Sequence, residues 1–89
     1  MVWKVEYLSS VQKDVKNFDV QTRSRIKDFI ENRLAKSSNP RELGHALKGM
    51  DLGELWRYWI GDYRVLCRIT DGKLTILVVK IGHRKEVYK

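Results

Sequence analysis

The sequence lacks the features that mark several classes of protein. Its one cysteine, Cys67, excludes an internal disulfide framework and fits a reducing compartment. Its longest apolar run, residues 74–79, falls far short of the roughly 20 residues that a membrane-spanning helix needs. Lys4 and Glu6 come too early to leave room for the apolar segment of a signal peptide. We therefore expect a cytoplasmic protein that has no membrane segment.

Proline and metal ligands are also scarce. The single proline, Pro40, predicts short loops without a linker. A chain of 89 residues can fill only one hydrophobic core, so we expect residues 1–89 to form a single domain. Two histidines and one thiol are a poor ligand set for structural zinc. We expect neither a metal nor a cofactor.

Negative charge is in deficit. The chain has 18 Lys and Arg against 11 Asp and Glu, which gives a net charge of +7. Such an excess on a small domain creates a field that attracts polyanions. The charge therefore predicts a nucleic acid or an acidic protein as partner, although it could serve solubility alone.

Periodic patterns place two helices after a leading strand. Residues 2–8 alternate between apolar and polar side chains, which predicts a strand. Ser9 and Gln12 fit a capping box for a short helix over about residues 10–17. Asp19 is a second candidate N-cap, and apolar residues at helical spacing follow it.

The rest of the chain is rich in β-strand signals. The second helix ends at residues 37–40, where proline disfavours helical geometry, and residues 41–53 are expected to form a loop with at most one helical turn. Three strands are predicted at residues 55–60, 63–70 and 73–81. The resulting order, β-α-α-β-β-β, predicts an α+β fold in which two helices pack on one face of a small antiparallel sheet.

Two tight turns fix the expected register of the last three strands. Gly61-Asp62 and Asp71-Gly72 are typical two-residue hairpin turns. One face should then form the core, and it carries Trp56, Tyr58, Ile60, Tyr63, Val65, Cys67, Ile69, Leu74, Ile76 and Val78. The opposite face carries Leu55, Arg57, Trp59, Arg64, Leu66, Arg68, Thr75, Leu77, Val79 and Ile81.

Three arginines share this second face. Arg57 should lie opposite Leu66, with Arg64 and Arg68 as diagonal neighbours. Guanidinium groups that gather without an acidic neighbour repel one another, so their grouping indicates an anion-binding site. The alternative is a solvated face on which the arginines extend over Leu66 and other apolar residues.

The C-terminal segment adds groups that suit phosphoryl transfer. Residues 82–89 carry an imidazole, a guanidinium, an ammonium and a phenol. Cleavage of RNA by its own 2′-hydroxyl needs a base, cations for the charged transition state and an acid for the leaving 5′-oxygen. This chemistry requires no metal ion.

Several spaced motifs resemble those of the RelE toxins of prokaryotic type II toxin–antitoxin systems. They are L-K-G at residues 47–49, L-W-R at 55–57, G-D-Y-R-V at 61–65 and I-G-H-R-K-E-V-Y at 81–88. The resemblance covers nearly the whole chain. It implies the RelE-like fold and an endoribonuclease that cuts messenger RNA in the ribosomal A site. It also implies a cognate RelB-like antitoxin that blocks the basic site.

The resemblance assigns roles to individual residues. Arg57 and Arg64 match strand cations near the scissile phosphate, and Arg84 matches the cation that stabilises the transition state. Tyr88 matches a tyrosine that stacks on a base or assists proton transfer, and His83 occupies a position that is histidine or basic in relatives. The expected RNA-binding residues are Lys48, Trp59, Arg68 and Lys85.

One departure leaves the general base open. Many relatives carry a second cation where this sequence has Trp59, which could stack on an A-site base, contact the antitoxin or indicate a weaker nuclease. His83 and Tyr88 are the candidate bases. Two alternatives are a ParE-type toxin that acts on DNA gyrase and a non-enzymatic nucleic-acid-binding module. His83 and Arg84 argue against the first alternative, because a gyrase inhibitor has no evident use for phosphoryl-transfer groups.

Overall fold

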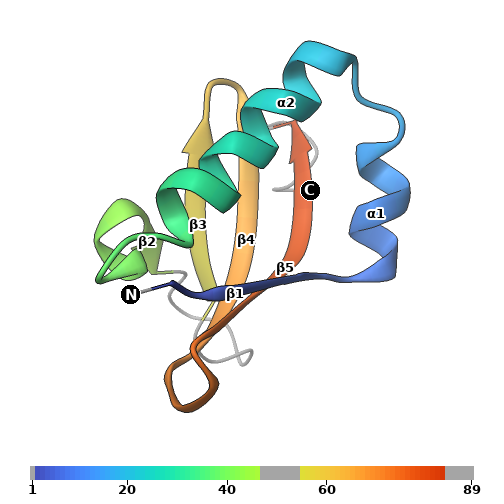
Figure 1. Ribbon diagram of the computed structural model, residues 1–89. Helices are drawn as coiled ribbons and strands as arrows, with labels where there is room; N and C mark the ends of the chain where they lie inside the picture. Colours follow the sequence, from blue (N-terminus) through green and yellow to red (C-terminus); the bar gives the residue numbers. More distant parts are fainter. Residues whose placement is uncertain (1, 47–54, 84–89) are drawn as a thin grey trace.

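A five-stranded mixed sheet carries the fold in the computed structural model, which describes residues 2–46 and 55–83 (Figure 1). The strands are β1 (Lys4–Tyr7), β2 (His45–Ala46), β3 (Leu55–Ile60), β4 (Tyr63–Thr70) and β5 (Thr75–His83), and their order in the sheet is β1-β5-β4-β3-β2. The pair β1–β5 is parallel, whereas the prediction was an antiparallel sheet. A parallel pair arises here because the two helices carry the chain back before the hairpins begin.

Two helices cover one face of this sheet and enclose the core. Helix α1 (Ser9–Val15) lies beside β5, and α2 (Val20–Asp28) runs across β3 and β4 (Figure 1). The buried core cluster consists of Trp3, Val11, Ile26, Ile30, Leu34, Ala35, Tyr58, Ile60, Val65, Cys67, Ile69, Ile76, Val78 and Ile81. This arrangement confirms the predicted α+β class. No helix in the described part of the chain is long and apolar enough to span a membrane.

Of the two predicted helix N-caps, the structure confirms one. The Asp19 carboxylate accepts a hydrogen bond from the Thr22 N–H at 3.4 Å, as expected of an N-cap. The capping box at Ser9 is wrong, because Leu8 is the N-cap residue and the Gln12 amide donates to the Tyr7 carbonyl instead. A π-helical segment, Phe29–Leu34, continues α2 toward the predicted end.

The first hairpin has the predicted register. Ile60 lies opposite Tyr63, and Trp56 lies opposite Cys67, so the two-residue turn at Gly61-Asp62 is confirmed. Gly61 has φ +59°, a conformation that glycine adopts without steric cost. Arg57 and Arg64 therefore lie on the face that turns away from the helices.

The second hairpin differs from its prediction. A four-residue connection replaces the expected turn at Asp71-Gly72, so Ile69 pairs with Ile76 and not with Leu74. This pairing places two buried isoleucines together and leaves Leu74 38% exposed at φ 46°. An irregularity where β4 passes from Leu66 to Cys67 then shifts the register of β5 by one residue. Ile81, predicted on the outer face, is consequently buried in the core.

The segment before β3 holds a strand that the sequence did not predict. The expected helical turn is present as a 3₁₀ turn, Pro40–Leu43, and β2 follows it. Strand β2 pairs antiparallel with β3, with His45 opposite Arg57. The Tyr58 hydroxyl donates to the Pro40 carbonyl at 2.9 Å and ties this segment to the core.

Candidate nucleic-acid interface

The predicted strand cations converge on one exposed indole. Trp59 lies on β3 between Arg57 of the same strand and Arg64, its cross-strand partner on β4. The Arg57 guanidinium lies 5.4 Å from the centroid of the Trp59 ring, and the Arg64 guanidinium lies 4.9 Å from it. Cations over the face of an indole are attracted by its π-electrons. The ring therefore holds together two groups that repel each other.

Backbone carbonyls fix the position of Arg64 further. Its Nη1 donates to the carbonyl oxygens of Gly61 and Tyr63, at 3.0 and 3.1 Å. The Arg64 side chain is half-buried at the end of the first hairpin. Because the turn aims its carbonyls at the guanidinium, this cation is already oriented when an anion arrives. A preorganised cation of this kind costs little reorganisation on binding.

A histidine that the sequence reasoning passed over completes the cluster. His45 of β2 lies directly opposite Arg57, and its ring centroid is 5.1 Å from that of Trp59. We call His45, Arg57, Trp59 and Arg64 the Trp59 cluster. His45 falls in a stretch with no periodic pattern, and its site became visible only through the pairing of β2 with β3.

The other predicted cations are distributed less closely. Arg68 is exposed on the same face as Arg57, opposite Leu55 and further from the Gly61 turn. The register shift also sets Lys80 opposite Leu66, a position to which the sequence assigned no role. Lys48, Arg84, Lys85 and Tyr88 lie outside the described residues.

His83 lies on the face of the sheet that the helices cover, opposite the face that carries the Trp59 cluster. It is directly opposite Tyr63, and their ring centroids are 5.7 Å apart in an edge-on contact. Tyr63 in turn contacts Phe18, which follows α1, at 5.1 Å. His83 also lines a pocket of about 540 Å³ together with Asp14 and Asn17. The structure thus separates His83 from the Trp59 cluster, although the sequence grouped it with Arg57 and Arg64.

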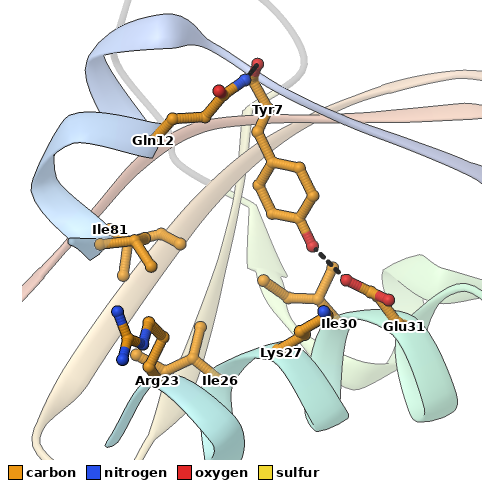
Figure 2. A pocket seen from close by; sticks show the side chains of 9 residues that line it. Tyr7, Gln12, Arg23, Ile26, Lys27, Ile30, Glu31 and Ile81 are labelled. Carbon is orange, nitrogen blue, oxygen red and sulfur yellow. Dashed lines mark hydrogen bonds between the residues drawn. The ribbon is translucent and has the colours of Figure 1, made fainter. Parts of the chain in front are cut away.

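A second pocket lies between the helices on the same side as His83. It has a volume of about 320 Å³ and is lined by Tyr7, Gln12, Val15, Arg23, Ile26, Lys27, Ile30, Glu31 and Ile81 (Figure 2). The Tyr7 hydroxyl donates to the Glu31 carboxylate at 3.0 Å. Burial, together with this bond, raises the pKa of Tyr7 well above its usual range. The phenol therefore stays protonated near neutral pH and is not a base.

Other buried groups are also chemically inert. Burial raises the pKa of the Cys67 thiol and of the Tyr58 phenol well above their usual ranges. Neither group ionises near neutral pH, so the thiolate needed for nucleophilic attack does not form. Among the residues that the structure describes, no group of three or more His, Cys, Asp or Glu side chains could hold a metal ion.

Comparison with known proteins gives one family and several similar structures. The family described as "ParE toxin of type II toxin-antitoxin system, parDE" matches residues 5–88. The protein Toxin RelG of Mycobacterium tuberculosis is 22% identical over 89 residues, which cover 100% of this chain and 99% of RelG.

Two solved complexes contain chains of the same fold. The toxin–antitoxin complex RelBE2 from Mycobacterium tuberculosis matches with a TM-score of 0.84 and 21% identity, over 97% of this chain and 95% of the other. The archaeal RelE–RelB complex from Pyrococcus horikoshii matches with a TM-score of 0.77 and 25% identity, over 97% and 99%. The match to the ParE profile spans nearly the whole chain. The chain therefore belongs to the RelE/ParE superfamily of toxins from type II toxin–antitoxin systems.

Proposed function

We propose that this toxin is a ribosome-dependent endoribonuclease that cuts messenger RNA in the A site. The RNA's own 2′-hydroxyl attacks the adjacent phosphorus, so the reaction needs no metal ion. The observation that carries the proposal is the Trp59 cluster, in which Arg57 and Arg64 converge on one indole. Neither β3 nor β4 contains an acidic residue that would neutralise these cations.

The cluster has the composition that binding of single-stranded RNA requires. Two guanidiniums can bind a phosphate and spread the charge that develops on it in the transition state. Trp59 is 53% exposed, so part of its indole is accessible for stacking on a base. Arg68 extends the positive face along β4, where it can contact the RNA backbone.

The remaining roles in the proposal fall on residues outside the described ranges, and we assign them from the resemblance to the RelE toxins. Arg84 stabilises the transition state, and Tyr88 stacks on a base or transfers a proton. Lys48 and Lys85 contact the RNA backbone. His83 remains a candidate base from the resemblance, but its contact with Tyr63 on the helix side weighs against that role.

The partner we propose is a RelB-like antitoxin, because the similar archaeal toxin is found in a complex with RelB. A net charge of +7 favours a partner segment rich in carboxylates. Such a segment would cover the Trp59 cluster and exclude RNA. The toxin would meet the ribosome in the cytoplasm.

Primer extension on messenger RNA tests the activity. After a short pulse of expression, we expect new 5′ ends within translated codons and none in untranslated regions. Uniform cuts along the message would contradict dependence on the ribosome. An absence of cuts in cells whose growth has stopped would overturn the proposal.

The ParE family match supports a second candidate function, inhibition of DNA gyrase. A supercoiling assay with purified gyrase and this toxin separates the two. We expect gyrase to relax and supercoil plasmid DNA normally in the presence of toxin. Inhibition at equimolar toxin, without cuts in messenger RNA, would favour the ParE-type activity.

A non-enzymatic nucleic-acid-binding module is the remaining alternative. Arg84→Ala removes a proposed transition-state cation, and we expect it to slow cleavage by roughly 10²–10³ while ribosome binding persists. Tyr88→Phe keeps the ring and loses the phenolic proton. Equal losses of binding and cleavage in both variants would indicate a binding role only.

A further inference from the structure

His45 is held firmly for a residue on a short edge strand. Its register opposite Arg57 is set by β2, and the preceding Gly44 packs so closely that an added Cβ would lie 2.6 Å from the Arg57 carbonyl oxygen. The Tyr58 hydroxyl binds the Pro40 carbonyl just upstream. The backbone on the N-terminal side of His45 is thus tied to β3.

The imidazole of His45 lies among the cations that the proposed reaction needs. Its ring is 5.1 Å from that of Trp59, with an angle of 34° between the planes. Arg57 contacts the same indole from β3, and Arg64 contacts it from β4. His83, the other histidine of the chain, lies on the opposite side of the sheet. His45 is therefore the histidine that can reach a phosphate bound by Arg57 and Arg64.

We propose that His45 is the general base of the reaction, an inference that rests on the proposed endoribonuclease function. One imidazole nitrogen takes the proton of the 2′-hydroxyl, and the 2′-oxygen forms a bond to phosphorus. The bond between phosphorus and the 5′-oxygen breaks, and the leaving oxygen takes a proton from water or from an acidic side chain. The imidazolium then returns its proton to water, which leaves a 2′,3′-cyclic phosphate and a 5′-hydroxyl.

The other side chains of the Trp59 cluster cannot serve as the base. Trp59 cannot accept a proton, because an indole N–H is only a donor. Arginine stays protonated at any relevant pH, so Arg57 and Arg64 cannot act as bases either. Imidazole changes its protonation state near neutral pH, where a general base is most effective. Arg57 and Arg64 then stabilise the charge on the phosphate, and His45 accepts the proton.

Two substitutions separate proton transfer from packing. His45→Phe keeps a ring against Trp59 but has no acceptor, and His45→Gln keeps a polar side chain that cannot transfer a proton. We expect each to lower the single-turnover rate on programmed ribosomes by about 10²-fold or more, with ribosome binding retained. His45 is exposed on a two-residue strand, so both variants should unfold near the wild-type temperature.

The pH profile and a modified substrate identify the role. We expect the single-turnover rate of the wild-type toxin to depend on pH, and the rate of His45→Gln to lose that dependence. A message with sulfur in place of the bridging 5′-oxygen has a leaving group that needs no proton. We expect His45→Gln to stay slow on it, because a missing base is not compensated by a better leaving group.

Each contrary result has a distinct meaning. A normal rate for His45→Phe would overturn the proposal by assigning the ring a packing role. Recovery of His45→Gln on the sulfur substrate would make His45 an acid and overturn its role as base. Loss of the pH dependence in His83→Gln, with His45→Gln normal, would transfer the role to His83. No cleavage by the wild-type toxin would overturn this proposal together with the proposed function.

Discussion

The guanidinium of Arg64 lies 4.9 Å from the centre of the Trp59 indole, directly across the first hairpin. Arg57 contacts the same ring at 5.4 Å. The Trp59 ring thus brings the two arginines of this face together. The indole reduces the cost of bringing two like charges together, since each is attracted to its π-electrons.

Substitution of Trp59 tests this organisation. Trp59→Ala removes both the stacking surface and the support of Arg57 and Arg64, so we expect a loss of about 1–3 kcal/mol in ribosome or RNA affinity. Trp59→Phe should retain most of the affinity. Binding titrations measure the effect, and thermal melts provide the control. The melting temperature should hardly change because Trp59 is 53% exposed, and a large fall would mean that its face belongs to the core.

Replacement of Gly44 by a larger residue is predicted to destabilise the fold, because the backbone there is closely packed. A Cβ at this position would lie 2.6 Å from the Arg57 carbonyl oxygen and 2.6 Å from a ring carbon of buried Tyr58. We expect Gly44→Ala to lower the free energy of unfolding by about 1–3 kcal/mol, the usual cost of overpacking. Gly72→Ala is the matched control, since an added Cβ there meets nothing within 4 Å. Equal denaturation midpoints for the two variants in urea would contradict this packing.

The first hairpin shows how far the sequence could predict the site. The two-residue turn at Gly61-Asp62, set between the predicted strands 55–60 and 63–70, determined a register that matches the structure at every pair. The shared face of Arg57, Trp59 and Arg64 followed from that register. Two-residue turns make such arithmetic reliable, because a slip by one residue would expose the whole core face.

The second hairpin shows where sequence reasoning failed. Residues 76–79 are all apolar, so alternation could not reveal the register shift that buries Ile81. The two-residue turn at Asp71-Gly72 was wrong, since four residues, 71–74, connect β4 to β5. The Asp71 carboxylate accepts two hydrogen bonds from Arg41, each 2.8 Å long, a contact between distant residues that the sequence did not predict. His45 escaped notice because a two-residue strand has no periodic pattern. Each of these features depends on a contact between residues distant in the sequence, and such a contact leaves no local pattern of residues from which it could be predicted.

The Arg41–Asp71 pair predicts a specific pH dependence. Hydrogen bonds from the Arg41 guanidinium hold the pKa of the Asp71 carboxyl below its usual range. A lowered folded-state pKa stabilises the fold at pH values above the ordinary value of about 3.9, and this contribution is lost as the pH falls through the folded-state pKa. In a carboxyl NMR titration, we expect Arg41→Gln to raise the midpoint of Asp71.

Asp19 is the internal control for this titration. Its pKa is also lowered, but by hydrogen bonding to Thr22 rather than by Arg41. We expect its midpoint to be the same in the wild-type protein and in Arg41→Gln. An unchanged midpoint for Asp71 would mean that the ion pair does not persist in solution.

Antitoxin binding should depend strongly on salt. A charge of +7 attracts an acidic partner over a screening length of about 30 Å at 0.01 M salt, which shrinks to about 8 Å at 0.15 M. We expect the association rate of the antitoxin to fall steeply over this range, and less steeply for Arg68→Gln. Lys13→Gln on α1 removes the same charge far from the Trp59 cluster and should keep the wild-type slope. An association rate independent of salt would contradict electrostatic attraction.

The most direct test of the central claim removes one hydroxyl group, the 2′-hydroxyl at the cleavage position, from the substrate. We would program ribosomes with a messenger RNA that carries a 2′-deoxynucleotide at the cleavage position, add the purified toxin, and compare the products with those of the all-ribose message. The account predicts that the ribose message is cut to a 2′,3′-cyclic or 3′-phosphate end, with EDTA changing nothing beyond its effect on ribosomes, and that the deoxy message stays intact. Cleavage of the deoxy message would contradict attack by the RNA's own 2′-hydroxyl.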